Sequence, residues 1–387
     1  HPPLGGFSLL LFAIALIGAL ECRRQAAELA PEASSLTPHS KIMQALLAMT
    51  VPVMIATNTW VFPLQALLVV GWIAWRYSQR DKPDWAALWF GGLLGFALLY
   101  PFLTGFAAKS LSTPMKLVQA QDHTPLRQFL ALHWPLLLFV GLGVWQKHTR
   151  RITLMFAATF GLMLLFSEMI YVDDPTGGRY ERTNSVMKWW GYIWTGAIVA
   201  LGGLLLGSQQ KVVRIVATLA IALTCLYSID VARYWIYSNK DAAGKLDASS
   251  VYTTDANARE MFRTLKSAPY GIVLENWYGD AYTDSGIYAV FAVKPSLMGW
   301  PSHLMTWHGN VGQAWALKEQ IRQFYLGTLA NSSDWLLANK VQYIVWSGKE
   351  SQNTAAWQQI QQAIGGTYAW HEYFANGDVK VGLWIKR

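Results

Sequence analysis

Charged residues are scarce in this chain of 387 residues. They make up 14% of the sequence, whereas soluble domains carry about 25%. The deficit indicates that lipid, rather than water, is the main solvent of the folded chain.

Cysteines and familiar catalytic signatures are equally scarce. The two cysteines, Cys22 and Cys225, fall in or beside apolar runs and form no CxxC pair, which argues against a thiolate metal site. The sequence has no glycine-rich phosphate loop, no GxSxG and no HExxH. The common nucleotide-binding, serine-hydrolase and zinc-protease classes therefore find no support.

Hydrophobic and aromatic residues are abundant instead. Hydrophobic residues make up 53% of the chain, which includes 20 Trp and 17 Tyr, as expected for two aromatic belts at membrane interfaces. The net charge of +8 comes from short basic clusters between apolar runs. Such clusters orient a protein in a bilayer, so we predict no nucleic-acid partner.

About eight apolar stretches approach the length of roughly 20 residues that a transmembrane helix needs. The second and third stretches are separated only by residues 58–60, which predicts a tight helical hairpin. The candidate spans are residues 3–21, 42–59, 61–76, 86–106, 127–146, 152–171, 189–207 and 212–232.

Lysines and arginines occupy every second connection between these spans, which predicts that those connections are cytoplasmic. The His1 end, the 107–126 and 172–188 loops and everything after about residue 235 then lie outside. We therefore expect a multi-pass protein of the plasma (inner) membrane, with a transmembrane domain over 1–235. The basic connections carry Arg23, Arg24 and Lys41, then Arg76, Arg80 and Lys82, then Lys147, Arg150 and Arg151, and finally Lys211 and Arg214.

Residues 247–387 have the character of a small α/β domain outside the membrane. Short buried strands are expected at 271–275 and 341–347, and helices at about 255–266, 311–326 and 354–364. Ser332 or Ser333 is expected to cap a further short helix. Asn376 and Gly377 predict the turn of a final hairpin.

The segment 168–190 is the first place where chemistry is expected. An unpaired carboxylate at Glu168 would be costly near hydrocarbon. The segment can hold a divalent cation through oxygen ligands, bind a lipid phosphate through its basic residues, or form an internal salt-bridge network. Its charged residues are Glu168, Asp173, Asp174, Arg179, Glu181, Arg182 and Lys188.

The segment 275–310 is the second candidate. Glu275 stands at a strand end, where open α/β sheets place ligands, and the Trp, Tyr and Gly residues that follow suit sugar recognition or anchoring at lipid headgroups. His303 and His308 lie five apart on what we expect to be a proline-broken loop. A hydrogen-bonding role is favoured over a metal site there. The turn Lys349-Glu350 is expected to be solvated.

Residues 168–188 resemble the uncharacterised membrane proteins of the DUF2298 or "YYY" family. Its members carry E-x-x-Y-x-x-D followed by R-M-N-T-x-F-K, and the second element reads RTNSVMK here. The matching residues are Glu168, Tyr171, Asp174, Arg182, Asn184 and Lys188.

The later part of the chain is similar to the same family. Gly299, Trp300 and His303 match its G-W-x-x-H element, but Leu304 replaces the following Glu and His308 replaces the Arg of W-R-G. The opening HPP resembles a D-L-H-P-H element. The resemblance thus implies that an N-terminal half with further spans, or a separate chain that supplies them, precedes this sequence.

The family is similar to the GT-C membrane glycosyltransferases, so the resemblance implies an outward-facing enzyme that uses a polyprenyl-phosphate-linked sugar. Arg179, Arg182 and Lys188, with Asn184, would bind the lipid phosphate. Glu168, Asp173 and Asp174 would position a divalent cation (Mg²⁺ or Mn²⁺) or orient those bases. Glu275 and the 277–308 loop, which includes Trp300, His303, Trp307 and His308, would approach the acceptor.

Two alternatives stay open at this point. A non-catalytic subunit of a membrane complex is favoured by the departures at Leu304 and His308. A lipid or solute transporter is less favoured, because few charges fall in the middle of the spans.

Overall fold

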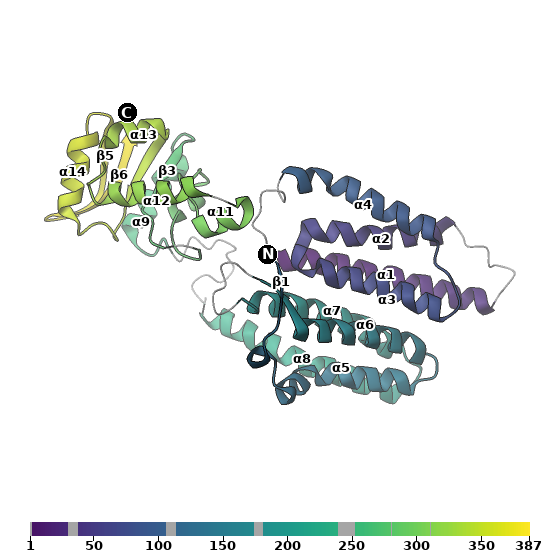
Figure 1. The fold of residues 1–387 in the computed structure, drawn as a ribbon. Helices are drawn as coiled ribbons and strands as arrows, with labels where there is room; N and C mark the ends of the chain where they lie inside the picture. Colours follow the sequence, from purple (N-terminus) through teal and green to yellow (C-terminus); the bar gives the residue numbers. More distant parts are fainter. Residues whose placement is uncertain are drawn as a thin grey trace. The chain divides into compact units, whose positions relative to one another are not determined.

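The computed structural model describes residues 2–29, 38–105, 114–173, 181–238, 252–279, 281–309 and 311–387. The described chain is mostly helical and divides into two compact units, with the division inside one helix at Arg233 and Tyr234 (Figure 1). Each unit has its own hydrophobic core.

The first unit consists of long apolar helices. Seven segments of the described residues are long and apolar enough to cross a membrane. One of them, His39–Ser78, contains two helices, which is why the expected count of about eight spans exceeds seven. The helices are α1 (Pro2–Leu29), α2 (Pro38–Asn58), α3 (Phe62–Ser78), α4 (Trp85–Gly105), α5 (Leu126–Trp145), α6 (Arg150–Met169), α7 (Thr183–Leu206) and α8 (Lys211–Ser238).

The predicted hairpin between α2 and α3 is confirmed by a buried polar network. Gln65 on α3 donates to Thr50 on α2 at 2.8 Å, although 15 residues of a straight helix would separate them by about 22 Å. Tyr192 on α7 donates to the same Gln65 at 2.5 Å. The short 3-10 helix Thr59–Val61 makes the reversal, and the network joins three helices across the apolar core.

Helices α2 and α4 pack closely because two glycines of α4 face α2. A Cβ on Gly91 would lie 1.9 Å from the carbonyl oxygen of Ala45, and one on Gly95 would lie 2.4 Å from Pro52. Small residues four apart let helix backbones approach in this way in lipid, where the hydrophobic effect does not drive helices together.

The first unit also contains a buried ion pair that the sequence did not suggest. Glu21 near the end of α1 accepts hydrogen bonds from Trp72 at 3.0 Å and Arg76 at 3.3 Å on α3. Glu21 and Arg76 are both buried. His133 on α5 is buried too: Trp194 on α7 donates to its Nδ1 at 3.0 Å, while its Nε2 has no hydrogen-bond partner among the described residues.

The second unit has a four-stranded sheet in the order β3-β4-β6-β5. Strands β3 and β4 are parallel, and the other two pairings are antiparallel. Its elements are α9 (Ala256–Ser267), β3 (Ile272–Leu274), α10 (Ile287–Ala292), α11 (Pro301–His308), α12 (Gly312–Tyr325), α13 (Ser332–Ala338), β4 (Val341–Trp346), α14 (Thr354–Ile364), β5 (Tyr368–Asn376) and β6 (Val379–Lys386).

Helices cover both faces of this sheet. Alternate residues of β4 point to opposite faces, as strand geometry requires. Ile344 and Trp346 pack with α12, α13 and α14, whereas Tyr343 and Val345 pack with α9 and α10. Burial on both faces explains why β4 reads as a continuous apolar run in the sequence.

The predicted hairpin is confirmed, but its turn lies one residue later than expected: Asn376 is still paired, with Val379, and Gly377, whose φ is +59°, makes the two-residue turn with Asp378. The cap of α13 was predicted wrongly. Asn331, in the left-handed region, precedes that helix and makes no side-chain cap, while the Ser332 hydroxyl bonds back to the carbonyl of Leu329 at 2.6 Å. Asp255 does cap α9 through the backbone amides of Asn257 and Ala258.

Candidate functional site

Two short strands organise the end of the helical unit at which α6 stops. Strand β1 (Met115–Leu117) pairs antiparallel with β2 (Ile170–Val172). Further backbone bonds, from Val118 to Met169 and from Asp173 to Pro114, extend the ladder at both ends with lengths of 2.9 Å. The segment before α5 is therefore fixed to the segment after α6, a pairing that we did not expect from the sequence.

Glu168 and Arg182 form the centre of this end. Arg182 Nη2 lies 2.6 Å from Glu168 Oε1, and Thr124 donates to the same carboxylate through its backbone amide and its hydroxyl, both at 2.9 Å. Arg182 also donates to the carbonyls of Ser167 and Asp122. Both charged side chains are about 15% exposed. The pair thus joins three chain segments, and it matches the internal salt-bridge network that the sequence left open.

A second ionic group lies on the same strands and is more accessible. Lys116 Nζ is 2.9 Å from Asp173 and 3.4 Å from Glu181, and these three side chains are 45%, 17% and 38% exposed. The hydrogen bond from Lys116 to Asp173 is the main cause that raises the lysine pKa, so Lys116 stays protonated. Tyr171 donates to Glu181 at 3.0 Å. Lys116 was not among the site residues predicted from the sequence. It lies in the 107–126 loop, which is not one of the basic connections.

The other predicted residues of this segment divide into two groups. Asn184 and Lys188 lie near the start of α7, where the Lys188 ammonium is 4.0 Å from the centre of the Trp60 ring. Asp174 and Arg179 lie outside the described residues. The structure therefore brings Glu168, Asp173 and Arg182 to one end of the helical unit, together with Lys116 and Glu181.

The carboxylates in the described part of the chain do not form an evident metal cage. No group of three or more His, Cys, Asp or Glu side chains gathers there in a way that could hold a metal ion. Asp173 and Glu181 instead share the Lys116 ammonium. A divalent cation at this end would have to replace that ammonium or use ligands outside the described residues.

In the second unit, Glu275 is buried directly after β3. Its carboxylate accepts the backbone amides of Tyr288 at 3.1 Å and Ala289 at 2.8 Å, at the start of α10. Burial raises its pKa to about 7, the two amides oppose that change, and nearby Glu350 adds to it. Glu275 is 7% exposed. Its contacts hold α10 on the sheet.

Glu350 was expected to lie in a solvated turn, and that expectation is wrong. Its side chain is buried. It accepts the Asn276 amide at 3.0 Å, the Ser347 amide and hydroxyl at 3.0 and 2.6 Å, and the Tyr278 hydroxyl. These residues follow β3 and β4, so the parallel pairing brings two loops 74 residues apart into contact. Lys349 is half-exposed.

The aromatic segment after Glu275 is helical in part. Residues 301–308 form α11, which begins at Pro301, instead of the expected proline-broken loop; proline is favoured at the first helical position. Trp300 and His303 lie 5.2 Å apart between ring centres and both contact Tyr282. His308 is five residues further along, which turns a helix by about 140°, so the two histidines do not face one point. The side chain of Trp307 lies outside the described residues.

Comparison with known proteins identifies no relative. No protein-family model, curated protein or solved structure matches this chain. The resemblance to the DUF2298 family therefore stays a prediction. What is established is a largely helical protein whose described residues include seven apolar segments able to cross a membrane and a small sheet near the C-terminus.

Proposed function

We propose that this chain is an integral membrane glycosyltransferase of the GT-C kind that takes a sugar from a polyprenyl phosphate. The observation that carries the proposal is the group of Lys116, Asp173 and Glu181, which places an accessible ammonium between two carboxylates at the end of apolar helices. By the distribution of lysine and arginine, that end faces outward from the plasma (inner) membrane. The second unit then lies outside the membrane as well.

In the proposed reaction, Lys116 receives the phosphate of the donor and Asp173 receives the proton of the acceptor hydroxyl. The acceptor oxygen forms a bond to the anomeric carbon while the bond from that carbon to the phosphate oxygen breaks. The lipid phosphate leaves with the negative charge that the ammonium stabilises. General-base assistance of this kind contributes about 10²–10⁴-fold.

Arg182 is proposed to hold the site in place. Its guanidinium donates to Glu168 and to two backbone carbonyls, and its side chain is only 15% exposed, so its proposed role is to fix these segments. Lys188, close to the same end of α7, is proposed to lie along the path of the lipid phosphate. No step is assigned to a divalent cation, because Asp173 and Glu181 already share the Lys116 ammonium.

Lipid binding tests the proposal directly. Native mass spectrometry of the full chain in detergent, with added undecaprenyl phosphate, is expected to show one bound lipid. Lys116→Ala is expected to weaken this binding about tenfold, since a hydrogen bond to a charged group contributes roughly 1.5–3 kcal/mol, and Lys116→Arg is expected to retain it. The matched control is Lys147→Ala, because Lys147 is exposed and lies in the connection at the opposite end of α6.

Transfer is then measured with polyprenyl-phosphate-linked sugars. Asp173→Asn is expected to lower the rate about a hundredfold or more without changing lipid binding. Equal lipid binding by the Lys116→Ala and Lys147→Ala proteins, or undiminished transfer by Asp173→Asn, would show that the ionic group is not the site.

A non-catalytic subunit of a membrane complex is the second candidate. The observation that favours it is that Glu168 and Arg182 bind one another and that Glu168 accepts two hydrogen bonds from Thr124, so both charges hold chain segments together. A stoichiometric partner protein in the same mass spectra, without bound polyprenyl phosphate, would favour this function over catalysis.

A further inference from the structure

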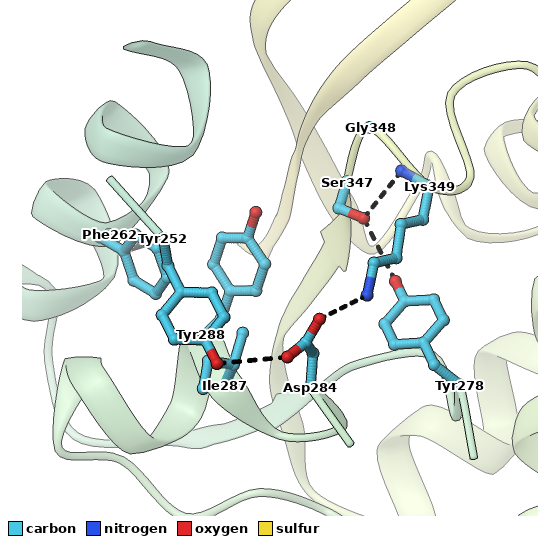
Figure 2. Close-up of a pocket in the computed structure, with 9 residues that line it drawn as sticks. All are labelled: Tyr252, Phe262, Tyr278, Asp284, Ile287, Tyr288, Ser347, Gly348 and Lys349. Atoms are coloured by element: carbon cyan, nitrogen blue, oxygen red, sulfur yellow. Dashed lines mark hydrogen bonds and ion pairs between the residues drawn. The ribbon is translucent and has the colours of Figure 1, made fainter. Parts of the chain in front are cut away.

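A pocket of about 210 Å³ opens in the second unit beside the carboxyl ends of β3 and β4 (Figure 2). Tyr278 follows β3, and Ser347 and Lys349 follow β4. The carboxyl ends of parallel strands are where open α/β sheets bind their ligands. Tyr278, Asp284, Ile287 and Tyr288 belong to the segment 275–310 that we expected to suit sugar recognition, although none of them was singled out.

Aromatic rings form much of the wall. Phe262 of α9 and Tyr288 of α10 stack with their ring centres 4.4 Å apart and their planes at 16°. Tyr252 and Tyr278 contribute two further rings. Rings of this kind offer flat apolar surfaces to the C–H face of a ligand, and tyrosine hydroxyls add hydrogen bonds at their edges.

Opposite charges meet at the rim. Asp284 Oδ2 lies 2.9 Å from the Lys349 ammonium, and its other oxygen accepts the Tyr252 hydroxyl at 3.2 Å, as Figure 2 shows. Asp284 and Lys349 are 45% and 50% exposed. An ammonium has three donors and a carboxylate about four acceptor sites, so both groups retain capacity for a ligand. The Lys349 hydrogen bond lowers the Asp284 pKa, which keeps it ionised.

The floor of the pocket is fixed before any ligand arrives. Buried Glu350 holds the Tyr278 hydroxyl, and it holds Ser347 through both its amide and its hydroxyl. The Lys349 ammonium lies 4.1 Å from the centre of the Tyr278 ring. The ring and the rim are thus positioned by a buried carboxylate that does not itself line the pocket. Because these side chains are already held in place, less conformational entropy is lost on binding.

Size and charge together select the ligand class. The volume is below the roughly 300–1,000 Å³ of pockets for drug-sized molecules, so one small ring fits better than a nucleotide or a lipid chain. The paired charges at the rim sum to zero, which suits an uncharged ligand. A polyhydroxylated ring has an apolar face for the aromatic wall and hydroxyls for Asp284 and Lys349.

We propose that this pocket binds a single neutral monosaccharide unit, with its C–H face on the tyrosine and phenylalanine rings and its hydroxyls on Asp284 and Lys349. The further assignment of this pocket as the recognition site for the sugar acceptor rests on the proposed function. Binding itself is a property of the second unit and is measured independently of transfer.

Saturation-transfer NMR on the full chain in detergent, with methyl glycosides of the common hexoses as probes, tests the assignment. At least one glycoside is expected to bind in the millimolar range, with the strongest transfer to its ring C–H protons. Asp284→Asn is expected to weaken binding about tenfold, because the carboxylate makes charge-assisted hydrogen bonds. Asp334→Asn, an exposed aspartate on α13 outside the pocket, is expected to leave binding unchanged.

Three outcomes would overturn the assignment: no glycoside binds, Asp284→Asn and Asp334→Asn bind it equally, or free amino acids displace it. Thermal unfolding of each variant checks that the fold is retained, and Tyr252→Phe provides a second, milder change at the same rim. If a glycoside binds but polyprenyl phosphate does not, the assignment of the pocket stands and the proposed glycosyltransferase function is refuted. Transfer that survives Asp284→Asn would refute the pocket as the acceptor site and leave the proposed function standing.

Discussion

The buried carboxyl of Glu275 makes the stability of the second unit depend on pH. Its pKa in the folded chain is about 7, compared with an ordinary value of 4.5. The folded state therefore binds this proton more tightly than the unfolded state does. The resulting stability is fully present below pH 4.5 and is lost as the pH rises through about 7.

The size of the effect follows from the two pKa values. At about 1.4 kcal/mol per pKa unit, the change from 4.5 to about 7 corresponds to about 3 kcal/mol. Because Glu275 bonds to the first amides of α10, opening of α10 is the motion that exposes it. Protection of α10 against hydrogen exchange is thus expected to fall up to about a hundredfold from about pH 5 to about pH 8.

Hydrogen-exchange mass spectrometry of the full chain measures this directly, after correction for the intrinsic pH dependence of exchange. Peptides covering α10 (Ile287–Ala292) report the effect, and peptides from α14 (Thr354–Ile364) serve as the internal control. Glu275→Gln is expected to make the protection of α10 independent of pH. Glu350 is the nearby charge that adds to the pKa of Glu275, so Glu350→Gln is expected to move the transition to lower pH. An unchanged pH dependence in Glu275→Gln would refute the reasoning.

Two further predictions concern the helical unit, and thermal unfolding in detergent checks both. Gly91→Ala places a Cβ 1.9 Å from a backbone carbonyl of α2 and is expected to destabilise the protein by about 1–3 kcal/mol, whereas Gly92→Ala, with nothing within 4 Å, is expected to be neutral or slightly stabilising. Tyr192→Phe leaves the buried Gln65 carbonyl without its donor and is expected to cost about 1 kcal/mol, and Tyr227→Phe at an exposed position is its control. Equal melting temperatures within either pair would contradict the packing described here.

The long helices could be predicted from the sequence because a single quantity, the length of an apolar run, sets them. The expected span at 127–146 corresponds to α5 at Leu126–Trp145, and that at 212–232 lies inside α8. The strands β3 and β4 were expected as well, since apolar runs of that length fit a sheet buried on both faces. Helices α10 and α11 were not expected, because they are short and their apolar residues follow no clear helical period.

The contacts of the candidate sites could be predicted only in part. The charges of residues 168–188 were visible in the sequence, but their partners Thr124 and Lys116 lie more than 40 residues away and are brought near by β1 and β2. Glu350 looks like a surface residue in the sequence, since its burial depends on hydrogen-bond donors from a loop 74 residues distant. Long-range pairing of this kind leaves no local signal.

The ladder between β1 and β2 has a consequence for how the end of the helical unit can move. The strand pairing, with one further backbone hydrogen bond at each end, attaches residues 114–118 before α5 to residues 169–173 at the end of α6. Residues 114–118 and 169–173 therefore form one paired unit. Under the proposed function, a lipid phosphate that displaces Lys116 would also move Asp173, and the hydrogen bonds between Val172 and Ser185 would carry that change to the first turn of α7.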